Sequence, residues 1–354
     1  MPSDQVARYA AVGVVTVVCA AAAVSFVVAR MPRRAIVSRP VPVDSPVARA
    51  ALMKTSYALV LEPHQSWSDP ESRFVGVVSV VSLNAPGARR LHTALECDRV
   101  HFAEGTGICL RRNTSAIGES LDVTLFNAAF EAIHQFSVDG FPSRARVSPD
   151  GRHAAFTAFV SGHSYADSNM STATLLLDTA SGRVLGNLEE FTILRDGARY
   201  QSPDVNYWGV TFSAADDAFF VTLRTHGVNY LARGSIATRT VTMLRPDVEC
   251  PSLSPDGTRL AFKRPTPERK WRLTTLDLRT LHETPLAELH SVDDQVEWLD
   301  TDHVLYESTA TDPATSGPII MMVSADGSGR PSVFAVNATS PAVVPHGSDL
   351  QSRQ

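Results

Sequence analysis

Hydrophobic positions divide the chain into two unlike parts. From Tyr9 to Ala29, 21 consecutive residues carry no charge, and a run of this length can cross a membrane as a single helix. After Thr55 the helical period nearly vanishes, and short runs of β-branched and aromatic residues alternate with clusters of turn residues. This second pattern is typical of an all-β domain.

A repeated turn organises the second part. The strings VSPDGRHAAF, from Val147, and LSPDGTRLAF, from Leu253, are nearly the same. Proline presets φ, aspartate bonds back to the backbone and glycine adopts the left-handed conformation, so each string predicts a hairpin. With weaker copies included, the first hairpins of the repeat start from His101, Arg146, Thr211, Ser252 and Glu297. Second hairpins follow from Thr174, Tyr230, Arg272 and Ile319.

The repeating unit is therefore four antiparallel strands with a period of roughly 40 to 60 residues, as in propeller blades. Five blades are visible directly. A sixth forms if SPAVV, from Ser340, supplies the inner strand and the segments from Ser56, Arg73 and Ala88 supply the other three. Such closure removes exposed edge strands. The sequence thus predicts an all-β, six-bladed β-propeller over residues 55–346, preceded by an N-terminal transmembrane helix.

The remaining segments have simpler interpretations. Residues 1–30 are predicted to be a transmembrane signal anchor, residues 31–54 a Pro-rich tether, and residues 347–354 a disordered tail. A cleaved signal peptide is the alternative to an anchor. Its apolar region is usually only about 7 to 15 residues long, and VVARM is a poor cleavage site, so we expect a retained single-pass anchor.

Four longer strings carry a family resemblance: SRARVSPDG, VNYWGVTF, CPSLSPDGTRLAFK and HSVDDQVEWL. They resemble the bacterial TolB-like β-propeller proteins, and more closely a membrane-anchored envelope group called TolB-like translocation proteins. The resemblance covers roughly Lys54 to Pro345 and implies a propeller exported to the cell envelope. Periplasmic TolB has an α/β domain before its propeller, and the interval from Arg30 to Tyr57 is too short for one. The Tol-Pal role is therefore not carried over.

Two arguments about membrane orientation disagree. Four arginines follow the apolar segment, whereas only Arg8 precedes it, and the positive-inside rule would then keep the propeller in the cytoplasm. The family resemblance implies export instead. We expect an extracytoplasmic propeller, with the arginine pattern as the opposing signal.

Composition and motifs narrow the classes of function. A formal net charge of -5 gives no surplus of positive charge for nucleic acid, which is not an expected partner. The sequence contains no G-x-S-x-G, no H-E-x-x-H and no C-x-x-C, so neither a serine hydrolase nor a zinc site is indicated. No cofactor is expected, with Ca²⁺ as the one possibility.

Candidate site residues lie on loops that lead into the inner strands, where propellers present groups at one mouth of the central channel. One segment supplies Asp204, Asn206, Tyr207 and Trp208, and another supplies Asp293, Asp294 and Glu297. The neighbouring basic residues are Arg144 and Arg146.

These residues have two readings. Asp204, Asn206, Asp293 and Asp294 could hold Ca²⁺ through oxygen ligands. The favoured reading is that they cap turns and pair with the two arginines, and that Trp208 packs within a blade.

Cys97 and Cys109 flank the expected hairpin CDRVHFAEGTGIC. Counting outward from its turn places Cys109 opposite Val100 or Arg99 rather than Cys97, so a disulfide would require a bulge. Buried thiols acting as small hydrophobic groups are an equal alternative.

These observations favour a membrane-tethered, non-enzymatic propeller that binds a protein, peptide or envelope component at its channel mouth. One alternative is a metal-dependent, lactonase-like hydrolase. Another is a purely structural scaffold for a membrane partner.

Overall fold

The computed structural model describes residues 44–63, 75–113, 120–161, 170–214, 217–268, 270–311 and 317–346. These residues belong to the second of two compact units, Val41–Gln354. The predicted anchor, the beginning of the tether and the C-terminal tail lie outside the described residues. Within the described ranges, no helix has the length and apolarity needed to span a membrane.

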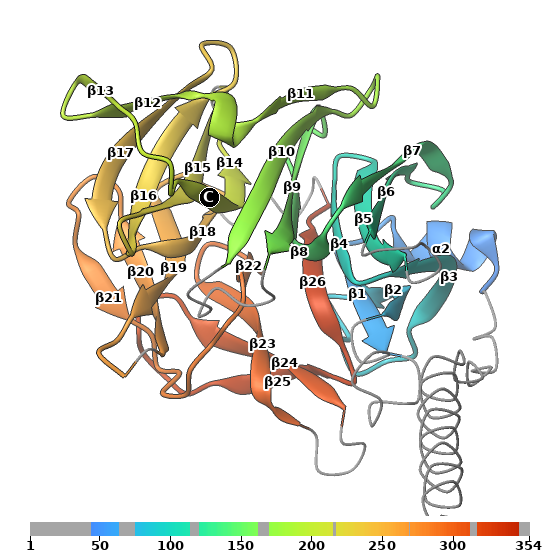
Figure 1. The fold of residues 1–354 in the computed structure, drawn as a ribbon. Helices are drawn as coiled ribbons and strands as arrows, with labels where there is room; N and C mark the ends of the chain where they lie inside the picture. The colour runs from blue at the N-terminus through green and yellow to red at the C-terminus, as the bar shows by residue number, and fades with distance from the viewer. Residues whose placement is uncertain are drawn as a thin grey trace, which may run out of the picture. The chain divides into compact units, whose positions relative to one another are not determined.

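Six sheets surround a central axis, with one inner strand of each nearest that axis (Figure 1). Blades 1 and 2 contain β4 (Arg99–Ala103), β5 (Thr106–Asn113), β6 (Ser120–Asn127), β7 (Ala132–Asp139), then β8 (Phe141–Val147), β9 (His153–Ser161), β10 (Ser171–Asp178) and β11 (Val184–Asn187). Blade 3 contains β14 (Asn206–Phe212), β15 (Ala218–Thr225), β16 (Val228–Ser235) and β17 (Thr240–Pro246).

The remaining sheets complete the ring. Blade 4 contains β18 (Glu249–Leu253), β19 (Arg259–Pro265), β20 (Trp271–Asp277) and β21 (Glu283–Pro285), and blade 5 contains β22 (Glu297–Trp298), β23 (His303–Thr311), β24 (Pro318–Ser324) and β25 (Ser332–Val336). The closing blade contains β26 (Thr339–Val344), β1 (Tyr57–Pro63), β2 (Gly76–Ser82) and β3 (Leu91–Cys97). The predicted six-bladed propeller is confirmed.

Burial follows position within a blade. The second strands β1, β9 and β15 are almost continuously buried, because neighbouring blades cover both of their faces. The third strand β6 alternates between buried and half-buried residues, and the outer strand β7 is exposed or half-buried throughout. Continuous apolar runs in the sequence therefore mark second strands rather than helices.

The two Ser-Pro-Asp-Gly turns are built alike. In blade 2 the Ser148 hydroxyl donates to the Asp150 carboxylate (2.6 Å) and accepts from the backbone N–H of His153 (2.9 Å). Gly151 has φ of +71°, a left-handed conformation that glycine adopts without steric cost. The turn at Ser254 has the same bonds to Asp256 (2.5 Å) and from Arg259 (2.9 Å). The predicted shared mechanics are confirmed, and the serine is part of them.

Blade 3 departs from the prediction. The stretch that leads into its inner strand was expected to be a loop, but it contains a hairpin of β12 (Thr192–Arg195) and β13 (Ala198–Tyr200). Asp196 and Gly197 both have positive φ, at 51° and 78°, as a two-residue hairpin turn requires. Strand β12 pairs in parallel with β17 and extends the sheet to six strands. The Asp-Gly turn was the signal for this hairpin in the sequence.

A short helix, α2 (Pro46–Leu52), lies within the segment predicted to be the tether. Arg49 of this helix is buried, donates to the carbonyl oxygen of His92 (3.1 Å) and lies over the ring of Phe130 at 5.7 Å. Leu52 packs against the same apolar cluster as the strands of the closing blade. The last part of this segment is therefore docked on the propeller.

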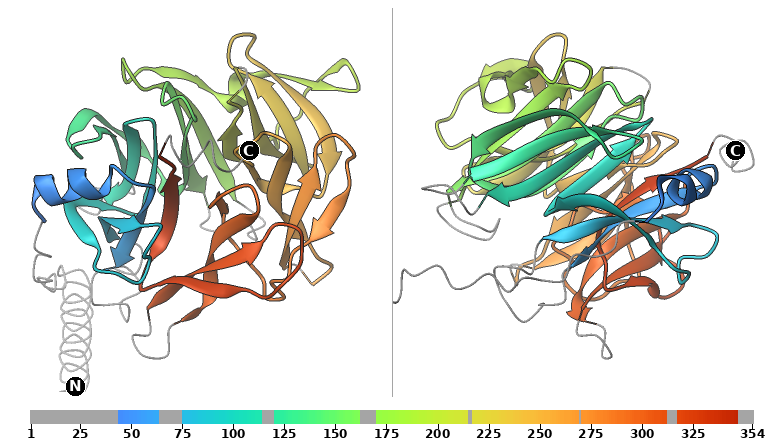
Figure 2. Two further views of the ribbon diagram at one scale, coloured as in Figure 1. Left: turned by 180° about the vertical axis from the view of Figure 1, so that it is seen from behind. Right: turned by 90° about the vertical axis from the view of Figure 1, so that its right-hand side faces the viewer.

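Both ends of the domain build the closing blade. Strand β26 pairs antiparallel with β1, with Tyr57 opposite Val344 and Leu59 opposite Ala342. Figure 2 shows the red C-terminal strand beside the blue N-terminal strand. The predicted closure is confirmed, and no inner strand is left unpaired within the described ring.

A disulfide joins Cys97 and Cys109, with an S–S distance of 2.04 Å. The register prediction is confirmed, since Cys109 lies opposite Val100. The expected bulge is absent from this hairpin, because Cys97 ends β3 of the closing blade instead of belonging to the hairpin. The disulfide therefore links the closing blade to blade 1.

Deletion of everything after Ala338 should cause a loss of cooperative unfolding, because it removes β26 and exposes the edge of β1. Thermal unfolding followed by circular dichroism measures the effect. The matched control ends at His346, which leaves every described contact in place and should unfold like the full chain. Equal melting curves for the two truncations would contradict this account of ring closure.

Candidate functional site

The inner strands meet at a buried ion pair on the channel axis. Arg146, on β8, donates to the Glu297 carboxylate of β22 in a short contact. Its second terminal nitrogen donates to the Val296 carbonyl oxygen (3.1 Å) and lies 3.4 Å from the Ser252 hydroxyl of β18. The other Glu297 oxygen accepts the backbone N–H of Val343 on β26 (3.1 Å). We call this group, with His101 and Gln295, the hub.

His101 and Gln295 extend the hub to the two remaining inner strands. The Nδ1 atom of His101, on β4, accepts the backbone N–H of Val147 (3.0 Å). Its Nε2 atom lies 3.0 Å from Nη1 of Arg146 and 3.6 Å from Glu297. Gln295 donates to the carbonyl oxygens of Val210 on β14 (3.0 Å) and Pro251 on β18 (2.9 Å). All six inner strands therefore contribute an atom to one hydrogen-bonded network.

Electrostatics hold the hub in one charge state. Burial alone would raise the pKa of Glu297, but the Arg146 guanidinium overrides this effect and lowers the pKa to about 2. Burial and the same guanidinium lower the pKa of His101. The hub is thus an ionised carboxylate, a guanidinium and a neutral imidazole at neutral pH.

Bulges recur where the inner strands approach the mouth. The pairing register shifts in β8, β14, β18 and β26. Gly209, Cys250 and Ser340 have φ of 69°, 49° and 49° at these points. A Cβ at Gly209 would lie 2.9 Å from Cα of Cys250. The bulges turn carbonyl oxygens toward the axis and allow neighbouring inner strands to approach closely.

A second charged group lies nearer the mouth. Lys263 is fully buried, 3.1 Å from Glu249 and 2.5 Å from Asp293, and its ammonium lies 4.3 Å from the centre of the Trp271 ring. Asp293 also lies 3.5 Å from Arg144 and is 40% exposed. Asp293 therefore sits at the rim, shared by two cations.

Glu307, on β23, has the opposite pKa shift. Burial raises its pKa to about 7, with the carboxylates of Asp294 and Asp293 adding to the shift and the guanidiniums of Arg99 and Arg144 opposing it. Glu307 therefore changes charge near neutral pH at the channel mouth.

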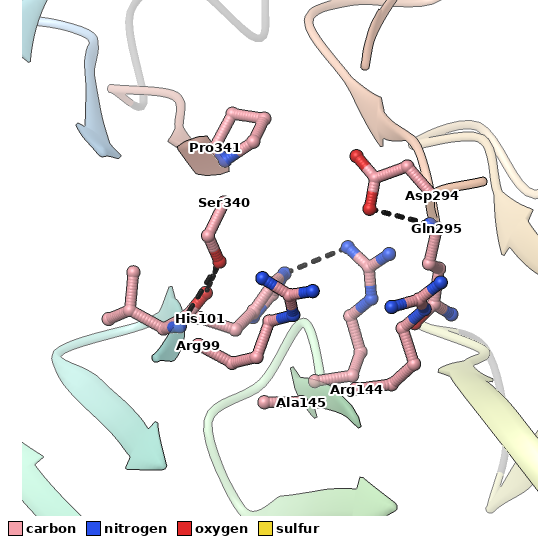
Figure 3. Close-up of a pocket in the computed structure, with 10 residues that line it drawn as sticks. Arg99, His101, Arg144, Ala145, Asp294, Gln295, Ser340 and Pro341 are labelled. Carbon is pink, nitrogen blue, oxygen red and sulfur yellow. Dashed lines mark hydrogen bonds between the residues drawn. The ribbon is translucent and has the colours of Figure 1, made fainter. Parts of the chain in front are cut away.

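Between the hub and the rim is a cavity of about 30 Å³, enough for about two water molecules. Figure 3 shows Arg99 and Arg144 extending into this space, with Asp294 on its far side. Its lining consists of Arg99, Val100, His101, Arg144, Ala145, Arg146, Asp294, Gln295, Ser340 and Pro341.

Three of the predicted site residues line this cavity: Arg144, Arg146 and Asp294. Asp293 lies at its rim. Asp294 accepts the backbone N–H groups of Gln295 (2.8 Å) and Glu307 (3.1 Å). The reading in which these acids cap turns and pair with arginines fits the geometry.

Asp204 and Asn206 have separate roles. Hydrogen bonds from Ser202 and Thr225, with partial desolvation opposing them, lower the pKa of Asp204 to about 2. Asn206 accepts the backbone N–H of Thr172 on β10 (2.8 Å). Across the described ranges, no three acidic, histidine or cysteine residues are grouped so that they could hold a metal ion. The four proposed Ca²⁺ ligands are therefore not assembled into one site.

Tyr207 and Trp208, two of the candidate site residues, do not face the channel mouth as open side chains. Both are fully buried, so neither side chain is open to a ligand. Tyr207 packs in the core of blade 3, and Trp208 packs with Phe159 and Cys250 between blades. The packing role expected for Trp208 is confirmed.

Sequence reasoning missed Arg99, His101, Gln295 and Ser340 at the channel. The signal for the first two was present, since Arg99 and His101 have the same i, i+2 spacing at an inner strand as Arg144 and Arg146. Alternate residues of a strand share one face. The equivalent position of β4 in its blade could have placed both residues on the axis.

Comparison with known proteins identifies the fold and goes no further. No protein-family model matches the sequence, and no curated protein matches it. Among solved structures, TolB from Acinetobacter baumannii has a TM-score of 0.55 at 15% identity, covering 82% of this chain and 67% of that one. The chain has a TolB-like propeller fold.

Two further structures are similar. A chain in the nidogen/laminin complex has a TM-score of 0.51 at 11% identity, covering 82% of this chain and 99% of that one. A protein described as a putative TolB from Agrobacterium tumefaciens has a TM-score of 0.48 at 10% identity, covering 82% and 96%. At these identities the likeness concerns the fold alone.

Replacement of Glu297 by Gln should lower the free energy of unfolding by about 3–5 kcal/mol, because Arg146 would remain buried without its counter-charge. Chemical denaturation measures the change. The matched control is Glu190→Gln. Glu190 is 65% exposed and forms a surface ion pair with Arg239, and loss of this ion pair should lower the free energy of unfolding by less than about 1 kcal/mol. Similar losses for both variants would argue against a stabilising hub.

Replacement of Glu307 by Gln should change how stability depends on pH. Between the ordinary pKa of 4.5 and about 7, the folded protein keeps a proton that the unfolded chain releases, so the free energy of unfolding falls as pH rises through this window. The variant should lack that fall and exceed the wild type by about 1–3 kcal/mol at pH 8. Denaturation at pH 5 and pH 8 tests this, with exposed Glu104→Gln as control. Parallel pH profiles for wild type and Glu307→Gln would refute the shifted titration.

Proposed function

We propose that this protein is a membrane-tethered, non-enzymatic propeller that binds a protein or peptide partner at its channel mouth, outside the cytoplasm. The membrane anchor in this proposal is the apolar segment from Tyr9 to Ala29, which lies outside the described residues. The propeller supplies a rigid ring, and the mouth supplies charged groups at its centre.

The size of the channel cavity carries the proposal. Pockets for small molecules usually enclose about 300–1,000 Å³, whereas this cavity is about 30 Å³. Beneath the cavity, Arg146, Glu297 and Gln295 join neighbouring inner strands through side-chain hydrogen bonds. A partner is therefore expected to bind across the mouth and to insert no more than one small group.

The disulfide supports the proposed location. Bonds such as that between Cys97 and Cys109 persist in oxidising compartments and are rare in the cytosol. This agrees with export, which the sequence resemblance implied, and opposes the orientation suggested by the arginines after the apolar segment. The TolB-like fold is compatible with a binding role.

The hydrolase alternative has no support in the geometry. Asp204 and Asn206 bind Ser202, Thr225 and Thr172 rather than converging with Asp293 and Asp294. The scaffold alternative predicts a partner on another surface, so location of the partner separates it from the proposal.

Photocrosslinking in the native cell tests the proposal. A benzoylphenylalanine at His290, whose side chain is 84% exposed beside the mouth, should give a discrete crosslinked product. The control position is Arg152, which is 80% exposed in the turn at the opposite end of blade 2, and it should give none. Product from Arg152 alone would favour the scaffold, and no product from either position would reject the proposed function.

A further inference from the structure

The charged side chains around the channel cavity are not all joined in ion pairs. Arg146 pairs with Glu297, and Arg144 lies 3.5 Å from Asp293. Arg99, half-buried at the start of β4, donates only to two carbonyl oxygens: Nε to Ser143 (2.8 Å) and Nη1 to Asp98 (3.2 Å). It forms no ion pair with any residue in the described part of the chain. The cavity therefore has one guanidinium without a paired carboxylate.

The geometry points to a binding site for a single carboxylate group between Arg99 and Arg144, supplied by the partner that occupies the mouth. This inference rests on the proposed function and deepens it. Guanidinium groups bind carboxylates through parallel N–H donors, and such charge-assisted bonds are stronger than neutral ones. The two arginines belong to neighbouring inner strands, β4 and β8, and extend toward the same space (Figure 3).

Size and charge favour a monoanion. A cavity of about 30 Å³ accommodates a group about as large as two water molecules. Asp294 borders the far side of the cavity, and its negative charge would repel the second charge of a sulfate or phosphate dianion. One free guanidinium opposite one carboxylate thus selects a small group with a single negative charge.

Access to the cavity comes from the rim. Asp293 is 40% exposed there and is held by Lys263 and Arg144, which leaves Arg99 as the unpaired cation behind it. The carboxylate could belong to a chain terminus or to an aspartate or glutamate side chain. Both sources present the same chemical group, so they are separated by experiment.

Ionisation of Glu307 should change the affinity of this site for a carboxylate. Glu307 is surrounded by Arg99 from β4, Arg144 from β8, and Asp293 and Asp294 before β22, and its pKa is raised to about 7. When Glu307 is ionised, its carboxylate neutralises part of the positive charge of Arg99 and repels an incoming anion. Carboxylate affinity is therefore expected to fall as pH rises through 7, and Glu307→Gln should remove this dependence.

Small carboxylate probes test the inference on the full chain. N-acetylglycine represents a chain terminus, N-acetylaspartic acid α-amide represents an acidic side chain, and N-acetylglycinamide is the matched probe without a carboxylate. Calorimetric titration at constant ionic strength should show binding of one or both carboxylates with a Kd on the order of 1–10 mM. N-acetylglycinamide and sulfate should bind at least about tenfold more weakly.

Variants locate the bound group. Arg99→Gln should weaken carboxylate binding at least about tenfold. Arg99→Lys should have an intermediate effect, because lysine keeps the positive charge but lacks the parallel N–H donors of the guanidinium group. The control Arg111→Gln changes an arginine of blade 1 that is 51% exposed and pairs with Glu96, and it should bind like the wild type. Circular dichroism confirms that each variant is folded.

The possible outcomes separate this inference from the proposed function. Equal binding by wild type and folded Arg99→Gln, or sulfate binding as tight as N-acetylglycine binding, would overturn the carboxylate site. If a product still crosslinks to His290 in that case, the partner-binding function stands and only the carboxylate site fails. Loss of the His290 product with intact carboxylate binding would reject the function and keep the site.

Discussion

The buried ion pair between Arg146 and Glu297 is the contact on which the rest of the ring depends. Six inner strands converge on one axis, and each brings backbone polar groups into a space with little room for water. A buried charge without a partner is costly, whereas a paired and hydrogen-bonded charge is tolerated. The hub meets this condition with one guanidinium, one carboxylate, one neutral imidazole and one amide. It thereby sets which strands can lie next to the axis.

Closure of the ring works together with the hub. Strand β26 pairs with β1 along its length, and the backbone N–H of Val343 on the same strand reaches Glu297. The C-terminal strand is thus held at once by its sheet and by the axis. The Cys97–Cys109 disulfide adds a covalent link between the closing blade and blade 1.

The ionisable groups with unusual pairing or shifted pKa values lie between the hub and the channel mouth. Below this level Arg146 and Glu297 form an ion pair, and Gln295 and His101 are hydrogen-bonded to neighbouring inner strands. Above it, Arg99 has no ion pair with any described residue, burial raises the pKa of Glu307 to about 7, and Asp293 is shared between Lys263 and Arg144. Perturbed or unpaired ionisable groups collect at functional sites because a ligand can complete their interactions. The same scaffold therefore has a charged recess at the mouth, and this recess is where we propose that a partner binds.

Local sequence patterns determined the fold, whereas contacts between distant strands determined the site. The Ser-Pro-Asp-Gly turns and the alternation of apolar residues act over a few positions, so the hairpins, the four-stranded repeat and the closing strand at Ser340 could be predicted. The hub pair joins residues 151 positions apart, and Cys97 meets Cys109 only because β3 ends beside blade 1. Tyr207 was predicted as a site residue, but β14 is buried on both faces from Tyr207 to Phe212, because this inner strand is covered by its neighbours. A bulge near Gly209 also shifts the register of this strand. A shift of one residue reverses the faces of a strand, and that register is decided only when neighbouring blades pack together.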